Sequence, residues 1–100
     1  MNEIEDLTSR IRDFAVKRNW EQFHTPKNLA MAISGEAGEL LAEFQWLTPE
    51  QSSRLTPEQR SSIELEIADI MIYLIRLTDV MKIDLYEVAL KKLQINESRF

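Results

Sequence analysis

Two pairs of acidic residues in this 100-residue chain have a spacing that could do chemistry. Glu36 and Glu39 form the first pair, Glu66 and Asp69 form the second, and each lies in an otherwise apolar stretch. Residues three apart share one face of a helix, and carboxylates among apolar residues are costly to bury unless a positive charge neutralises them. A hard divalent cation held by carboxylate oxygens does this, and Mg²⁺ suits such ligands. The four residues are therefore predicted to bind Mg²⁺ and to act on a phosphorylated substrate.

The residues alone leave an alternative open, because an acidic pair on a helix is usually a solvated face. The same strip could belong to a non-catalytic helical interaction module that binds a basic partner. A di-iron carboxylate site is disfavoured, since those sites use Glu-x-x-His and neither pair here contains histidine. Glu43 continues the stripe of the first pair. It is a candidate for a fifth metal ligand or for a residue that supports the ligands, and the alternative is an exposed residue without a role.

Aromatic and basic residues form a second group of candidates. Trp20, Phe23 and Trp46 are either core residues or rings that stack on a nucleobase. His24 is the only histidine, and its chemistry alone favours a surface or capping role. One face of the last predicted helix carries three polar residues that either reach phosphates or complement the helix dipole: Lys92, Asn96 and Arg99.

The elements that must position these residues are predicted to be helices, because apolar residues recur at i+3 and i+4 and only 2 Gly and 3 Pro occur. We expect an all-α fold in a single domain over residues 1–100. Thr-Pro signals predict helix starts. The predicted helices cover residues 3–18, 26–47, 57–81 and 85–97, with a short helical turn beginning near residue 48. The third helix is apolar on both sides of its acidic stripe, which predicts oligomerisation.

Composition excludes several classes of function. The net charge is −5, with 17 acidic and 12 basic residues and no basic run, so no nucleic-acid polymer is expected as a partner. The absence of cysteine excludes disulfides and thiolate metal sites. The first residues contain no apolar signal-peptide core, and no stretch is long enough to span a membrane. We expect a soluble cytoplasmic protein without a membrane partner.

Several segments together resemble the MazG-like all-α nucleoside triphosphate pyrophosphatases, and within them the dCTP pyrophosphatase branch. The resemblance covers nearly the whole chain. It rests on residues 20–24 (WEQFH), 26–29 (PKNL), 35–40 (GEAGEL), 44–46 (FQW), 66–70 (EIADI), 73–74 (YL) and 92–99 (KLQINESR).

This resemblance implies a four-helix bundle-type fold assembled as dimers or as a dimer of dimers, a homotetramer. It implies hydrolysis of a (deoxy)nucleoside triphosphate to the monophosphate and pyrophosphate, as nucleotide-pool house-cleaning. It also implies Mg²⁺ on Glu36, Glu39, Glu66 and Asp69, with Glu39 or Glu36 acting on the attacking water. The implied substrate-binding residues are Trp20, Phe23, His24, Lys27, Asn28, Trp46, Tyr73, Lys92, Asn96 and Arg99.

Two positions depart from the dCTP-specific pattern of that branch. Ile11 stands where a histidine near the substrate is expected, and Glu97-Ser98 stand where arginine is expected. Both departures concern the choice of base and leave the predicted catalytic residues unchanged.

Overall fold

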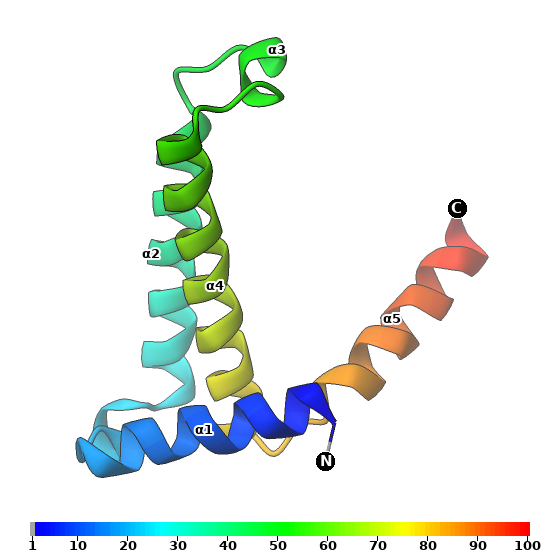
Figure 1. The fold of residues 1–100 in the computed structure, drawn as a ribbon. Helices are drawn as coiled ribbons and strands as arrows, with labels where there is room; N and C mark the ends of the chain where they lie inside the picture. The colour runs from blue at the N-terminus through cyan, green and yellow to red at the C-terminus, as the bar shows by residue number, and fades with distance from the viewer. Residues whose placement is uncertain (1) are drawn as a thin grey trace.

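All regular secondary structure is helical over residues 2–100, the range that the computed structural model describes (Figure 1). No strand occurs in this range, which confirms the all-α prediction. In chain order the elements are α1 (Glu3–Lys17), the 3-10 helix η1 (Glu21–Phe23), α2 (Pro26–Phe44), α3 (Pro49–Ser52), α4 (Pro57–Val80) and α5 (Leu85–Arg99).

Three Thr-Pro pairs begin α2, α3 and α4, as the sequence predicts. In each case the threonine hydroxyl accepts a hydrogen bond from the backbone N–H three residues on, and proline occupies the first turn. At Thr48 and Thr56 the bond is reciprocated, because the side chains of Gln51 and Gln59 accept from the threonine backbone N–H at 2.9 Å. These starts depend only on neighbouring residues, so they could be located from sequence.

The end of α2 was predicted at residue 47, and this is wrong by three residues. The helix stops at Phe44, and the backbone N–H of Leu47 bonds to the carbonyl of Phe44 in a closing turn. Thr48 precedes proline and is extended, with φ −73° and ψ 161°, as residues before proline prefer. The chain must therefore leave the helix before Thr48, and Trp46 lies in the turn instead of on the helical stripe.

The main packing unit is the antiparallel pair of α2 and α4, with α1 lying across its lower end (Figure 1). Leu29 of α2 and Ile75 of α4 are fully buried where the three helices meet, and Ala15 of α1 joins them. Burying each large aliphatic side chain contributes about 1.5–3 kcal/mol. The core is small and lies close to the end of the pair that α1 covers.

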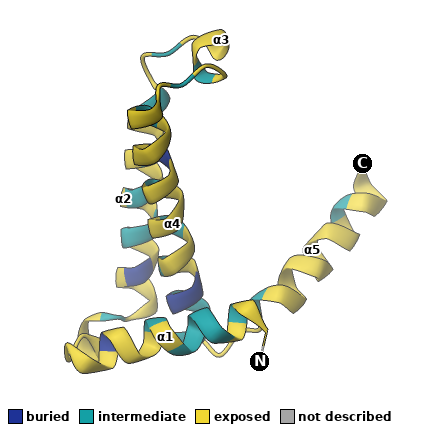
Figure 2. Cartoon of the chain, in the orientation of Figure 1, coloured by how far each residue is buried: buried dark blue, intermediate teal, exposed yellow. Residues whose placement is uncertain are grey.

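Helix α5 projects away from the other helices and is exposed along nearly its whole length (Figure 2). The radius of gyration is 16.0 Å, against about 13 Å for a compact 100-residue domain. The four long helices therefore do not close into a bundle within one chain. Large apolar side chains are left exposed on α2, α4 and α5, among them Met31, Leu41, Leu65, Ile67, Ile72, Val88, Leu93 and Ile95. Within residues 2–100, no helix has both the length and the apolar character needed to cross a membrane.

Candidate functional site

Three of the predicted metal ligands meet between α2 and α4. Glu36 and Glu39 are one turn apart on α2, and Glu66 faces them from the antiparallel α4. Each contributes one carboxylate oxygen, and these oxygens all lie within 4.8 Å of one another. Among the ion pairs of the described residues, none includes any of the three. The cluster is therefore a concentration of negative charge without a protein cation to balance it.

The buried oxygens of this cluster lack partners. Glu36 Oε2 and Glu66 Oε2 are inaccessible to solvent and accept no hydrogen bond within residues 2–100. Burial, followed by the nearby Glu39 and Glu36 carboxylates, raises the pKa of Glu66 to about 7. Burial and the charge of Glu39 also raise the pKa of Glu36. Because unpaired buried carboxylate oxygens cost stability, this arrangement suits a bound cation.

The fourth predicted ligand, Asp69, is exposed and lies one turn along α4 from Glu66. It is not one of the three residues whose oxygens converge, but its charge contributes to the raised pKa of Glu36. Its side chain lines the neighbouring cavity. Asp69 therefore stands between the acidic cluster and that cavity. Glu43, two turns along α2 from Glu36, is partly buried and lies outside the cluster.

A cavity of about 490 Å³ adjoins the acidic cluster and is walled largely by aromatic and aliphatic side chains. Its volume is in the range of small-molecule sites. The lining residues come from α1, the loop after it, and α4: Ile11, Phe14, Ala15, Trp20, Phe23, His24, Asp69, Ile72, Tyr73 and Arg76. A flat, mostly apolar ligand with a negatively charged end could lie in the cavity with that end toward Asp69 and the acidic cluster, if a cation were held there.

The loop that carries Trp20, Phe23 and His24 is held at both ends. At the end of α1, Asn19 adopts a left-handed conformation with φ 57°, and the N–H of Trp20 bonds to the carbonyl of Ala15 at 3.0 Å. The Trp20 ring meets Phe14 edge-on, with centroids 5.6 Å apart. At the other end, the Asn28 amide donates to the carbonyl of Phe23 at 2.9 Å. Asn28, a predicted substrate contact, thus fastens the loop to α2.

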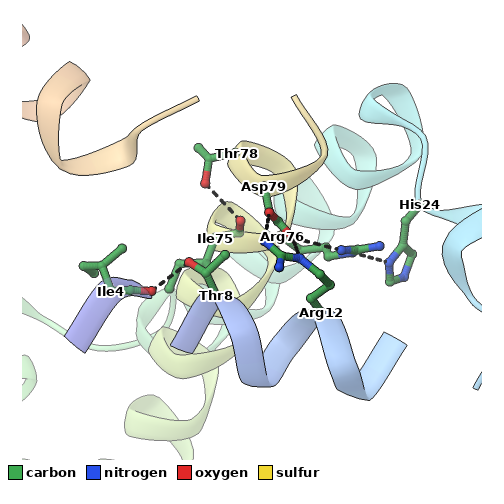
Figure 3. A network of polar contacts seen from close by, with 8 residues as sticks. All are labelled: Ile4, Thr8, Arg12, His24, Ile75, Arg76, Thr78 and Asp79. Carbon is green, nitrogen blue, oxygen red and sulfur yellow. Dashed lines mark hydrogen bonds and ion pairs between the residues drawn. The ribbon is translucent and has the colours of Figure 1, made fainter. Parts of the chain in front are cut away.

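His24 belongs to a polar network at the crossing of α1 and α4 (Figure 3). Arg76 Nε donates to His24 Nδ1 at 3.0 Å, and Arg76 Nη1 lies 3.3 Å from Asp79 Oδ2. Arg12 of α1 donates two hydrogen bonds, of 2.9 and 2.6 Å, to the same Asp79 carboxylate. Burial and the charge of Arg76 lower the pKa of His24. The hydrogen bond from Arg12 lowers the pKa of Asp79.

The remaining predicted site residues lie elsewhere within a single chain. Trp46 is 87 % exposed in the turn after α2, and it does not line the cavity. Lys27 is exposed in the first turn of α2. The three residues of the last helix are on the projecting α5, away from the acidic cluster (Figure 1): Lys92, Asn96 and Arg99.

Arg76 is a site residue that the sequence predictions did not include. It is 6 % exposed, lines the cavity and bonds to His24. The signal was present, because Arg76 continues the stripe of Glu66, Asp69 and Tyr73 at helical spacing on a largely apolar helix. Ile11, at one of the departing positions, also lines the cavity and offers it an apolar surface.

Comparison with known proteins places this geometry in context. Residues 31–99 match the MazG-like family. The chain is 38 % identical to dCTP pyrophosphatase 1 of Bos taurus and of Homo sapiens, over 97 % of its own length. It spans 59 % and 58 % of those two proteins, respectively. A solved pyrophosphatase structure from Archaeoglobus fulgidus superposes with a TM-score of 0.94 at 38 % identity, covering 100 % of this chain and 94 % of that one.

Proposed function

The chain belongs to the MazG-like family, and from this premise we propose that it hydrolyses (deoxy)nucleoside triphosphates, dCTP among them, to the monophosphate and pyrophosphate. The observation that carries the proposal is the convergence of three carboxylates beside an aromatic cavity, with Asp69 between them. The names of the similar proteins support the same reaction class. The cellular role we propose is removal of unwanted nucleotides from the pool.

The acidic cluster fits Mg²⁺ on the evidence of its own atoms. All of its donors are carboxylate oxygens, which hard divalent cations prefer, and two of them are buried without a partner. Glu36, Glu39, Glu66 and Asp69 would hold the ion. When bound, it supplies Lewis-acid polarisation of a phosphoryl oxygen and lowers the pKa of a coordinated water.

The cavity is assigned to the nucleoside. Trp20, Phe23 and Tyr73 offer ring faces on which a base can stack, a contact worth about 1–3 kcal/mol per base in nucleic-acid binders. The mostly apolar walls exclude water from the bound base. With the base in this position, the triphosphate extends past Asp69 toward the carboxylates. This orientation brings the α-phosphorus next to Glu39.

Glu39 is our candidate for the group that accepts the proton of the attacking water. It is the exposed member of the acidic cluster, whereas Glu36 and Glu66 each have a buried oxygen. The water oxygen forms a bond to the α-phosphorus, the bond from that phosphorus to the bridging oxygen breaks, and pyrophosphate leaves with the bridging oxygen. Glu36, one turn away, orients the water or the Glu39 carboxylate.

We propose that the working enzyme is a homo-oligomer, a dimer or a dimer of dimers, in which α5 packs on another copy. A 15-residue helix without tertiary packing is marginal in water. Many apolar side chains of α2, α4 and α5 are exposed, and contiguous exposed apolar surface commonly marks a protein–protein interface. A neighbouring α5 would then bring Lys92, Asn96 and Arg99 to the phosphates.

The test is pyrophosphate release from a panel of dNTPs and NTPs, with Mg²⁺ and with EDTA. We expect Mg²⁺-dependent release, with dCTP among the best substrates. A folded, oligomeric sample that releases pyrophosphate from none of them would exclude the proposal and favour a binding module. The oligomeric state itself is measured by light scattering on the same sample.

A further inference from the structure

Arg76 determines where His24 carries its proton. The guanidinium group can only donate hydrogen bonds, and Arg76 Nε donates to His24 Nδ1 at 3.0 Å. Nδ1 must therefore present its lone pair. A neutral imidazole has one N–H group, so that group is on Nε2.

The guanidinium of Arg76 is also held in place by Asp79, through an atom other than the one that contacts His24. Arg76 Nη1 contacts Asp79 Oδ2 at 3.3 Å, and Arg12 binds both oxygens of the same carboxylate. Arg76 is 6 % exposed and has little freedom to turn away. Two guanidinium groups surround one carboxylate, which leaves a net positive charge beside the imidazole. A second proton on His24 is opposed by this charge.

His24 also forms part of the cavity wall. The charged or titratable groups that line the cavity with it are Asp69, Tyr73 and Arg76, all of α4, and the Trp20 ring lies 6.1 Å from the His24 ring. Within residues 2–100, His24 Nε2 makes no hydrogen bond, whereas Nδ1 is used by Arg76 (Figure 3). His24 Nδ1 is therefore occupied by Arg76, and the Nε2–H group is available to a ligand.

We propose that Arg76 is a positioning residue that fixes His24 as a neutral Nε2–H donor, which binds an acceptor atom of the nucleobase. This inference rests on the proposed nucleotide substrate. Cytosine carries two adjacent acceptors, O2 and N3, on one edge of its ring. Uracil and thymine carry an N–H group at N3, which would oppose the His24 donor. Because O2 and O4 of uracil and thymine also accept hydrogen bonds, the donor favours cytosine when it is placed against N3, and it does so without a charged base-reading group.

The first test is NMR spectroscopy of the ligand-free protein, which needs no variant because His24 is the only histidine. The ¹⁵N shifts of its two ring nitrogens should show a protonated Nε2 and an unprotonated Nδ1 at pH 7. The pKa of His24 should lie below the usual value of about 6.5. A ring that is protonated on Nδ1, or doubly protonated, at pH 7 would overturn the inference.

Variants then separate positioning from folding. Arg76→Met removes the donor, so His24 should become a mixture of tautomers with a higher pKa. Arg12→Gln loosens the same network without touching His24, and it should lower stability while leaving the tautomer unchanged. If Arg76→Met left the ¹⁵N shifts as in the wild type, Arg76 would not fix the proton.

Kinetics test the contact with the base. In Arg76→Met the KM for dCTP should rise by about tenfold, the effect of one lost hydrogen bond, while kcat changes less than about threefold. His24→Gln, which keeps an N–H donor, should retain more affinity than His24→Leu. Arg60→Gln, on the exposed part of α4, is the control for loss of an arginine and should match the wild type.

The two proposals fail in different ways. A wild-type protein that hydrolyses dCTP but whose KM is unchanged by Arg76→Met and His24→Leu overturns this inference alone. A wild-type protein that neither binds nor hydrolyses any nucleoside triphosphate overturns the proposed function, and the base contact with it. In that case the NMR result still decides whether Arg76 fixes the His24 proton.

Discussion

Two polar clusters lie along α4, and they are built in opposite ways. The first surrounds Glu66 and contains three carboxylates, no cation, and two buried oxygens without hydrogen-bond partners. The second, about 20 Å farther along the helix, surrounds Asp79 and pairs its carboxylate with two arginines. The first cluster leaves its charges unbalanced, whereas the second balances a carboxylate within the chain.

This difference separates the cluster that we propose binds a metal ion from a network that orders the fold. Like charges held together between helices oppose folding unless something binds them. Opposite charges with bidentate geometry link α1 to α4 and need nothing more. The shifts of pKa follow the same division, because the pKa of Glu66 is raised to about 7 and the pKa of Asp79 is lowered. Four predictions test whether the two clusters divide chemistry and stability in this way.

The largest expected effect is on turnover, and it comes from a substitution in the first cluster. Glu39→Gln should lower kcat by about 10²–10⁴-fold, the usual contribution of a general base, because the amide cannot accept the proton of the water. The free energy of unfolding should not fall, since one negative charge beside Glu66 is removed. Steady-state pyrophosphate release and urea denaturation measure the two quantities. Glu64→Gln, two residues from Glu66 but exposed in a surface pair with Arg60, should behave as wild type.

The second cluster should show the reverse pattern. Asp79→Asn leaves Arg12 and Arg76 facing each other without an anion, and it should lower the free energy of unfolding by about 2–3 kcal/mol. At a temperature where the variant is folded, kcat at saturating dCTP should stay within about threefold of wild type. Urea denaturation at a fixed protein concentration checks the first value. An Asp79→Asn protein that kept its stability but lost turnover would contradict the assignment of the second cluster to stability.

Divalent metal should stabilise the first cluster only. At a Mg²⁺ concentration 100 times its dissociation constant, binding adds about 2.7 kcal/mol, which should raise the Tm by several degrees. The increase should vanish in Glu66→Gln and persist in Asp79→Asn. Thermal denaturation with and without Mg²⁺ measures this, and Ca²⁺ serves as a second hard cation. An equal increase in Glu66→Gln would place the ion elsewhere.

The smallest effect is on the pH dependence of stability, and its sign differs between the clusters. The folded pKa of Glu66 is above its ordinary value of 4.5, so without metal its ionisation opposes folding. Its contribution to stability is largest below about pH 4.5 and is lost as the pH rises through about 7. Asp79 has a lowered pKa, so its contribution is present above about pH 4 and is lost in more acidic solution.

Urea denaturation from pH 3 to pH 8 distinguishes these two contributions. Glu66→Gln should flatten the slope between pH 5 and pH 7, and saturating Mg²⁺ should do the same in wild type, because bound metal keeps the carboxylates ionised. Asp79→Asn should instead alter the loss of stability in more acidic solution. If the slope of stability between pH 5 and pH 7 persisted in Glu66→Gln, another group would titrate in that range.

Much of the molecule was predictable because its determinants are local. The three Thr-Pro starts depend on contacts between residues three apart, and the two acidic pairs lie on single helix faces by their spacing. The amino-acid sequence by itself therefore determined the helices, the residues at which the four long ones begin, and the acidic stripes, whereas the predicted helix ends differ from the structure by one to three residues. The MazG-like resemblance, which the comparisons confirm, also came from short segments.

Only the tertiary structure decided which distant residues meet. Arg76 and His24 are 52 residues apart, and their contact depends on how α1, the following loop and α4 cross, which periodicity does not specify. The same packing left Glu36 Oε2 and Glu66 Oε2 without partners and placed Asp69 at the cavity. It also turned α5 away from its own chain, a direction that the helical periodicity of α5 does not specify.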